Sequence, residues 1–408
     1  MLSSAARATP TVSAGALLDD ILALSARRTP TVHVVEGGIP YYVSEFWTAA
    51  QRRAHSLQEV SYRACFKPQL PEFFIARLTA PGDAVHDPFM GRGTAPLQAA
   101  LMGRRPLGND INPLSLLLTR PRLSPPTPAQ VAARLDEVPW NEGEPERDDL
   151  LAFYHPETLR QLAALRAWLL RRAPLDCTAP DPVDDWIRAV ALTRLTGHSP
   201  GFFSVYTLPP NQAVQVDAQI RINARRNQVP PRRDVAAIIR KKTLSLLKDG
   251  TPGAHPPARL SVGPASTTPH IADGSVALVV TSPPFLDVVQ YEADNWLRCW
   301  FAGIEAGSVS VTLHRSEARW TEMVRVALTE QARLLRPGGH VAFEVGEIRR
   351  GTVLLERLVW EAASGLPFER LAVIVNKQPF TKTAHCWGIG NNAVGTNTNR
   401  IVLLRRSR

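Results

Sequence analysis

The chain alternates short apolar runs with stretches of helical spacing, and two of the apolar runs lead directly into unusual loops. Residues 277–280 are four consecutive apolar residues, followed by Thr281 and then by Ser-Pro-Pro-Phe. The run predicts a short buried strand, which Pro283 ends because proline has no amide hydrogen to donate to a sheet. Residues 83–94 form a second strand-like run that passes into a turn with two glycines and then into a helix-like stretch. Ligands bind at the carboxyl ends of strands in open α/β sheets, so both loops are candidates for a functional site.

The other predicted elements follow the same patterns of period and turn residues. Apolar and aromatic residues at helical spacing predict a helix over residues 44–64. A short strand over residues 106–110 ends in Asp110, where Rossmann-like sheets carry a ribose-binding carboxylate; a helix cap is the alternative for this residue. Further helices are predicted over residues 71–78, 95–102, 157–171 and 183–195, and further strands over residues 258–262, 340–345, 371–376 and 400–404.

The α/β alternation is interrupted between residues 124 and 257, where turn residues cluster at both edges. We therefore expect an insertion that is largely helical. One part of it, residues 197–213, carries His198, Phe202, Phe203 and Tyr206 among prolines. These aromatic rings suit contact with a base stack, and a packed loop is the alternative.

Charge points to a polyanionic partner. The chain has 47 Lys and Arg residues against 37 Asp and Glu residues, a formal net charge of +10. Residues 219–248 contain nine basic residues and only one acid, Asp234, which predicts phosphate contacts; a solvated helix face is the alternative. The residues in this segment that are candidates for binding the phosphates of a nucleic acid are Arg221, Arg225, Arg226, Arg232, Arg233, Lys241 and Lys242.

Cysteine spacing and hydropathy exclude several other classes of protein. The four cysteines are widely spaced and form no Cys-x-x-Cys pair, so neither a metal site nor a disulfide framework is expected. No run of 18 apolar residues occurs, and Asp19 and Asp20 interrupt the apolar core that a signal peptide needs. We expect a soluble cytoplasmic protein in a reducing compartment.

Two motifs resemble those of the S-adenosylmethionine-dependent DNA amino-methyltransferases. They are residues 87–94, Asp-Pro-Phe-Met-Gly-Arg-Gly-Thr, and residues 282–285, Ser-Pro-Pro-Phe. Residues 66–69, Phe-Lys-Pro-Gln, resemble a further part of the cofactor site, with a turn into the next helix as the alternative. The resemblance implies S-adenosylmethionine as cofactor, and it implies the cofactor-binding residues Phe66, Lys67, Pro68, Asp87, Phe89, Gly91, Gly93, Thr94 and Asp110.

The same resemblance assigns the chemistry to Ser282, Pro283, Pro284 and Phe285. It implies that the Ser282 hydroxyl and the Pro283 carbonyl accept hydrogen bonds from an exocyclic NH2 group, and that Phe285 stacks on a flipped base. A surface turn is the alternative for this tetrapeptide. Members of the family with Ser before Pro-Pro mostly methylate cytosine N4, so N4-methylcytosine in double-stranded DNA is the expected product and N6-methyladenine the alternative. Cytosine C5 methylation is disfavoured because no cysteine follows a proline.

The resemblance also implies the fold and the organisation of the chain. We expect a Rossmann-like methyltransferase fold with a mostly parallel seven-stranded sheet and an inserted, largely helical recognition region. The expected parts are an N-terminal tail (1–43), a cofactor-binding half (44–123), a target-recognition region (124–257) and a catalytic half (258–408).

Two features bear on how far this resemblance extends. Residues 263–266, Gly-Pro-Ala-Ser, lack the acid that many relatives carry after a glycine to contact the adenine ring. Residues 381–399 are polar enough for a loop near DNA, whereas Trp296 and Trp300 are expected to pack a helix. A basic nucleic-acid-binding protein with an inactive methyltransferase fold is the alternative from another functional class.

Overall fold

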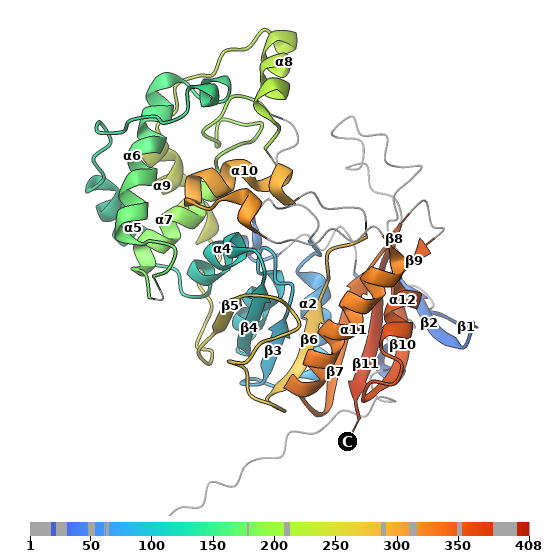
Figure 1. Ribbon diagram of the computed structural model, residues 1–408. Helices are drawn as coiled ribbons and strands as arrows, with labels where there is room; N and C mark the ends of the chain where they lie inside the picture. The colour runs from blue at the N-terminus through green and yellow to red at the C-terminus, as the bar shows by residue number, and fades with distance from the viewer. Residues whose placement is uncertain are drawn as a thin grey trace, which may run out of the picture.

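A computed structural model describes residues 18–21, 31–47, 54–60, 62, 65–177, 179–207, 213–286, 291–309, 316–348, 353–377 and 398–407 of the chain. These residues form a sheet with the strand order β1-β2-β10-β11-β7-β6-β3-β4-β5, and helices cover both of its faces (Figure 1). The strands are β1 Val32–Glu36, β2 Ile39–Ser44, β3 Ala84–Asp87, β4 Arg105–Asp110, β5 Arg259–Val262, β6 Val276–Thr281, β7 Leu335–Val345, β10 Phe368–Lys377 and β11 Thr398–Arg406, with a separate pair β8 Glu347–Ile348 and β9 Val353–Leu354.

The helices fall into a group that covers the sheet and a group that stands beside it. Those on the sheet are α2 Gln69–Leu78, α3 Thr94–Leu101, α11 Glu317–Leu334 and α12 Leu355–Ala362. Those beside it are α4 Pro113–Leu123, α5 Pro128–Asp136, α6 Pro156–Arg172, α7 Pro182–Leu192, α8 Val216–Arg226, α9 Val235–Leu246 and α10 Tyr291–Ala302, and short 3-10 turns form η1 Ser56–Gln58, η2 Asp148–Ala152 and η3 Ala306–Ser308.

The centre of the sheet is parallel, which brings four strand ends to one edge. β3 pairs parallel with β4 and β6, and β6 pairs parallel with β7, while β11 runs antiparallel between β7 and β10. All six residues of β6 are buried, as expected for a parallel strand that is covered on both faces. The carboxyl ends of β3, β4, β6 and β7 therefore meet along the same edge.

Each face of the sheet has its own apolar core. On one face Trp320 and Leu328 of α11 pack with Val279 and Phe343 of the sheet. On the other face Phe74 of α2 packs against the neighbouring side chains of β6 and β7. Figure 1 shows α11 and α12 in front of the sheet and α2 behind it.

The helices beside the sheet share one core with α3. Trp186 of α7, Leu162 of α6 and Leu117 of α4 belong to a single buried cluster, which also takes in residues of α10. Trp296 and Trp300 of α10 pack against this cluster, so their predicted role in helix packing is confirmed. The green helices of Figure 1 thus share their core with α4 and α10.

The predicted α/β fold is confirmed, with a correction near the amino terminus. Of the predicted helix 44–64, the described part is not α-helical: Ser44 ends β2, and residues 54–60 contain only the short turn η1. The reason is tertiary, because β2 pairs parallel with β10 and so becomes part of the sheet. The hairpin β1–β2 turns at Gly37 and Gly38, both with positive φ, and it extends the sheet beyond the seven expected strands.

The remaining predicted helices and strands match observed elements with shifts of a few residues. Residues 381–397 of the predicted DNA-proximal loop lie outside the described residues. Among the described residues, no helix has the length and apolar character needed to cross a membrane, and no three His, Cys, Asp or Glu side chains gather as a possible metal site.

Candidate functional site

The carboxyl edge of the sheet brings together the two motifs that stand far apart in the sequence. Asp87 ends β3, Asp110 ends β4, and Ser282 follows β6 directly. The Thr281 hydroxyl donates a 2.6 Å hydrogen bond to Asp87 Oδ1 across a sequence separation of 194 residues. The glycine motif and the Ser-Pro-Pro-Phe motif therefore lie next to each other at this edge.

The glycine loop has a backbone that only small residues permit. Gly91 and Gly93 have positive φ values of 50° and 76°. A Cβ atom at Gly93 would lie 2.2 Å from the Thr119 side-chain oxygen, so any side chain there would clash. Because α3 begins at Thr94, its first backbone N–H groups, which have no partner within the helix, belong to this loop. The loop lets a ligand approach the backbone closely.

Asp87 is buried, with one carboxylate oxygen satisfied and the other available. Its Oδ1 accepts hydrogen bonds from Thr281 and from the Phe89 amide, the latter at 3.1 Å. Its Oδ2 has no hydrogen-bond partner among the described residues, although the side chain is only 1% exposed. Burial raises the pKa of Asp87 to about 7. An orphaned buried carboxylate oxygen of this kind fits a positively charged ligand group.

Asp110 joins the glycine loop to β4. Its Oδ2 accepts a 2.8 Å hydrogen bond from the Gly91 amide, and its Oδ1 accepts one of 2.9 Å from the Asn112 amide. Burial raises the pKa of this carboxyl as well. The N-cap of α4 is Asn112, which accepts from Leu114 N, so the helix-cap alternative for Asp110 is wrong. The two carboxylate oxygens have four lone pairs, so beside these amides and the Ser115 side chain they can still accept a hydrogen bond from a ligand hydroxyl.

Tyr62 is a site residue that the sequence patterns do not reveal. Its hydroxyl oxygen accepts a 2.9 Å hydrogen bond from Asn112 Nδ2, and its ring borders Gly91. Burial raises its pKa, with the charge of Asp110 adding to the effect. Tyr62 thus lies beside the Asp110 carboxylate and the glycine loop. The only pattern in its part of the sequence is the helical spacing of apolar residues, which wrongly predicts a helix.

The Ser-Pro-Pro-Phe loop is anchored from α11. The buried Trp320 indole donates a 2.9 Å hydrogen bond to the Pro284 carbonyl oxygen. Phe285 packs closely against Gly346, where an added Cβ atom would lie 3.2 Å from the ring. Ser282 is half-buried at the start of this loop. Its position is therefore fixed by the strand on one side and by the anchored prolines on the other.

Glu344 of β7 is a second site residue that the sequence does not reveal. The register of β6 and β7 pairs Thr281 with Phe343, which places Glu344 beside Ser282. The Glu344 carboxylate is 5% exposed, accepts a 2.8 Å hydrogen bond from Asn399 Nδ2 and interacts with the Ser282 hydroxyl. Burial raises its pKa, and the hydrogen bonds from Ser282 and Asn399 oppose this shift.

The other predicted cofactor residues lie around the glycine loop. The Phe66 side chain is buried in the core beneath α2, and its carbonyl oxygen accepts a 3.4 Å hydrogen bond from Arg92 of the loop. Pro68 precedes α2 as its N-cap. Lys67, between Phe66 and Pro68, is exposed. Thr94 is buried and accepts a 3.0 Å hydrogen bond from Arg92 Nε.

The predicted basic segment forms α8 and α9 and is not brought into the carboxyl-edge site. Figure 1 shows α8 at the top of the view, beyond α10. The side chains that are exposed are Arg221, Arg225, Arg226, Arg232 and Lys241. Arg233 is half-buried, and its amide donates to the Thr158 hydroxyl. Lys242 is 7% exposed and forms a 2.6 Å ion pair with Glu59, so a phosphate contact would require that pair to break.

The aromatic loop of the helical region is mostly packed. Phe202 and Phe203 are buried, and Arg194 lies over the Phe202 ring at 4.2 Å. The packed-loop alternative is therefore correct for these two rings. Tyr206 is half-buried beneath the Arg226 guanidinium at 3.8 Å, whereas His198 is exposed.

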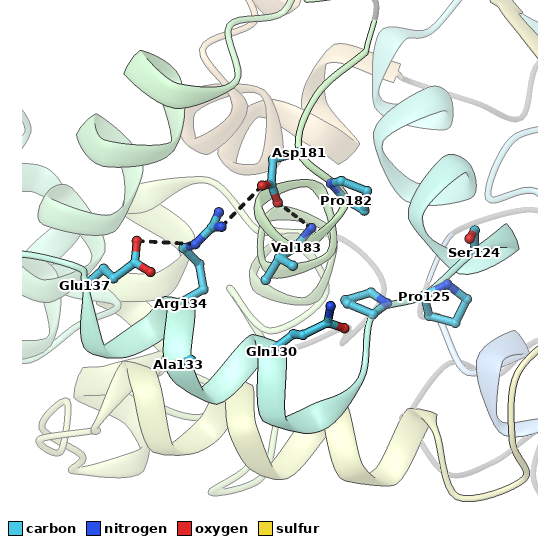
Figure 2. Close-up of a pocket in the computed structure, with 10 residues that line it drawn as sticks. Ser124, Pro125, Gln130, Ala133, Arg134, Glu137, Asp181, Pro182 and Val183 are labelled. Carbon is cyan, nitrogen blue, oxygen red and sulfur yellow. Dashed lines mark hydrogen bonds and ion pairs between the residues drawn. The ribbon is translucent and has the colours of Figure 1, made fainter.

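A hollow of about 490 Å³ in the helical region is separate from this site. Figure 2 shows it between α5 and the start of α7, with Arg134 turned towards Glu137 and Asp181. Arg134 also pairs with Asp184, so carboxylates already surround its charge. None of the site residues predicted from the sequence lines this hollow.

Comparisons with known proteins agree with the motif at residues 87–94. A family model described as DNA methylase, covering N6 and N4 enzymes, matches residues 38–117. A Type II methyltransferase of Methanocaldococcus jannaschii, M.MjaII, is 42% identical over 62 residues, which is 15% of this chain and 12% of that protein.

Solved structures give more distant matches. TrmN from Thermus thermophilus is 14% identical with a TM-score of 0.34, over 84% of this chain and 50% of that one. The rRNA methyltransferase aviRa from Streptomyces viridochromogenes is 13% identical with a TM-score of 0.32, over 86% and 89%. The chain spans about an eighth of M.MjaII and half of TrmN.

The residues at the edge fit S-adenosylmethionine, the cofactor of this family. The ammonium group of the cofactor suits the unpaired Oδ2 of Asp87, and its ribose hydroxyls suit the remaining lone pairs of Asp110. At Gly91 and Gly93 the glycine loop has no side chains that would keep the cofactor from its backbone. Over residues 38–117, which contain the glycine loop, the chain is similar to the N6 and N4 DNA methylases.

Proposed function

We propose that the protein transfers a methyl group from S-adenosylmethionine to the exocyclic N4 nitrogen of a cytosine in double-stranded DNA. One observation carries the proposal: the Thr281–Asp87 hydrogen bond of 2.6 Å joins the cofactor motif to the residue that precedes Ser282. A side chain that faces a target amine and a loop that holds a methyl donor are useful together only when they are neighbours.

The residues on the cofactor side of the site bind S-adenosylmethionine and orient it. S-adenosylmethionine, when bound, would supply a methyl group on a positively charged sulfur: the amine nitrogen bonds to the methyl carbon as the carbon–sulfur bond breaks, S-adenosylhomocysteine leaves as a neutral thioether, and one amine proton is released to solvent. Asp87 pairs with the ammonium group, and Asp110 accepts from the ribose hydroxyls while it keeps the Gly91 amide in place. Tyr62 and Asn112 close the Asp110 side of the site.

Ser282 accepts a hydrogen bond from the target NH2 group, and Glu344 makes it an acceptor. A hydroxyl has one proton and two lone pairs. Because the buried Glu344 carboxylate interacts with the Ser282 hydroxyl, it takes the one proton and leaves the oxygen lone pairs for the amine. The Trp320 bond to the Pro284 carbonyl keeps the neighbouring Pro283 carbonyl, the second acceptor, in a fixed loop.

The base and the DNA are recognised by different parts of the molecule. The target base leaves the duplex and stacks on Phe285, as required for chemistry on a base edge. The segment 124–257 serves as the target-recognition region, and the exposed arginines of α8 contact phosphates. Ser282 favours cytosine N4 by the tendency of the family, and adenine N6 is the alternative.

The test is nucleoside mass spectrometry of DNA from cells that express the wild type or a Ser282→Ala variant. N4-methylcytosine with the wild type and its loss with the variant are expected. N6-methyladenine would contradict the choice of base, and equal methylation by both proteins would contradict the role of the hydroxyl. DNA binding without any methylated nucleoside would favour an inactive nucleic-acid-binding protein.

A further inference from the structure

Arg92 occupies the middle of the glycine loop, yet its guanidinium is bonded within the protein. Its Nη1 donates to the Val60 carbonyl at 2.6 Å, its Nη2 to the Phe66 carbonyl at 3.4 Å and its Nε to the Thr94 hydroxyl at 3.0 Å. These acceptors lie on both sides of the loop and on the chain segment that precedes it. One side chain therefore ties the glycine loop to Val60 and Phe66.

Arg122 of α4 also connects the glycine loop to the segment that precedes it. It is 2% exposed, and it donates to the Leu57 carbonyl at 3.0 Å, to the Leu118 carbonyl at 2.7 Å and to the carbonyl of Arg92 itself. None of the ion pairs found among the described residues involves Arg122. Burial lowers its pKa to about 9, with the nearby Arg92 charge as a further cause. A buried guanidinium without a carboxylate is destabilising in itself, which favours a role in holding geometry.

The segment that receives these bonds is itself fixed to α9 and the turn that follows it. The Ser56 hydroxyl donates to the Leu246 carbonyl at 2.6 Å, and the Ser56 amide donates to Asp249 at 2.8 Å. Glu59 pairs with Lys242, and Gln58 Nε2 donates to the Thr94 carbonyl at 3.2 Å. Residues 56–60 thus form a rigid frame, and the two arginines tie the glycine loop to it.

We propose that Arg92 and Arg122 are positioning residues that pre-organise the glycine loop for S-adenosylmethionine. The inference rests on the proposed function, because it assigns the loop to that cofactor. Two glycines with positive φ leave the loop with many conformations in isolation, and ordering them on binding would weaken affinity. The arginines order the loop beforehand, and they hold Gly91 N where Asp110 accepts from it.

A direct contact between Arg92 and the carboxylate of the cofactor is the competing explanation. The two explanations differ in what happens with a ligand that lacks this carboxylate. S-adenosylhomocysteine carries the amino-acid group, whereas 5′-methylthioadenosine does not. A positioning role affects both ligands by the same factor, and a direct contact affects only the first.

The experiment is calorimetry of both ligands with wild type, Arg92→Lys and Arg122→Lys, alongside thermal unfolding of each protein. Lysine keeps the charge but loses the fork of donors. We expect both dissociation constants to rise about ten- to a hundredfold in each variant, with their ratio unchanged.

Arg104→Lys is the matched control. Arg104 donates to the Thr79 hydroxyl at 3.0 Å and to the carbonyls of Thr79 and Met102, the same pattern at the opposite end of α3. Its replacement should leave both affinities unchanged.

Unchanged affinities in a folded Arg92→Lys protein, or a loss confined to S-adenosylhomocysteine, would overturn the inference. A wild type that binds both ligands but methylates no DNA would contradict the proposed function alone, because the inference is judged on affinity; a wild type that binds neither ligand would overturn both.

Discussion

The sequence predicts functional residues both at the carboxyl edge of the sheet and on the helices α8 and α9. In the structure, those at the edge are largely buried, whereas most of those on the helices are exposed. At the edge, Asp87, Glu344 and Thr281 are buried and bonded to one another or to neighbouring strands. On α8, Arg221 and Arg225 are exposed at the surface. Chemistry requires groups that are oriented before the substrate arrives, whereas phosphate binding requires charge that solvent and DNA can reach. Changes at the edge should therefore act sharply, and changes on the helices should act gradually.

The largest effect is expected from Gly93→Ala. The new Cβ atom would meet Thr119 at 2.2 Å on a backbone with positive φ, so the loop must move. The dissociation constant of S-adenosylmethionine, measured by calorimetry, should rise by about a hundredfold or more. Gly82→Ala is the control, because Gly82 also has positive φ but no atom within 4 Å of its added Cβ. Equal affinity losses in the two variants would refute the role of close packing.

Asp87 should make cofactor binding depend on pH. Its pKa in the folded protein is about 7, so below that value the carboxyl is increasingly protonated and cannot pair with the ammonium group. From about pH 5 to 7 the dissociation constant should fall roughly tenfold per pH unit, and Asp87→Asn should abolish this dependence. A wild-type affinity that is flat across this range would contradict the assignment of Asp87.

The same carboxyl predicts the direction of the change in stability. The unfolded Asp87 releases its proton near pH 4, whereas the folded one releases it near 7, so the folded state binds more protons between these values. The free energy of unfolding without cofactor should therefore decrease as pH rises through this window. Urea unfolding of wild type and Asp87→Asn at several pH values measures the difference, and an increase specific to the wild type would be the contrary result.

Glu344→Gln should slow methyl transfer without weakening cofactor binding. The amide no longer holds the Ser282 proton firmly, so the hydroxyl is less often an acceptor for the target amine. A rate loss of about tenfold is expected in single-turnover assays, equivalent to one weakened hydrogen bond in the transition state. Glu369→Gln is the control, because the Glu369 side chain, at the start of β10, is 57% exposed and pairs with Arg405 of β11. A full rate in Glu344→Gln would remove Glu344 from the mechanism.

The smallest and most gradual effect is expected from neutralising Arg225 and Arg226 on α8. Each lost phosphate contact should reduce the slope of log affinity against log salt by about 0.9, with no change in cofactor affinity. Arg240→Gln provides the comparison, because Arg240 already pairs with Asp136. An unaltered slope in the α8 variants would exclude this helix from the DNA interface.

The sequence predicts those parts of the site whose signal is local. The strand ends at Asp87, Asp110 and Ser282 follow from short apolar runs that stop at prolines or glycines, and the α/β order follows from their alternation. The hairpin β1–β2 is missed, because its pairing partner β10 is more than 300 residues away in the sequence.

The residues that support the site are not predictable in this way. Glu344 lies beside Ser282 only because of the register of β6 with β7. The residues around it in the sequence predict a strand and nothing more. A charged residue on a helix normally faces solvent. The Arg122 guanidinium instead lies in the interior, where it donates hydrogen bonds to three carbonyl oxygens. Such roles depend on tertiary contacts, which a one-dimensional pattern does not contain.

The most direct test of the central claim uses purified protein, S-adenosylmethionine with a deuterated methyl group, and duplex DNA, followed by nucleoside mass spectrometry. If the two motifs form one site, the wild type yields deuterated N4-methylcytosine. Ser282→Ala should lose this product while it still binds cofactor, and Asp87→Asn should lose it through weakened cofactor binding. Labelled product from Ser282→Ala at the wild-type rate, or no labelled nucleoside from a wild type that binds both cofactor and DNA, would contradict the account.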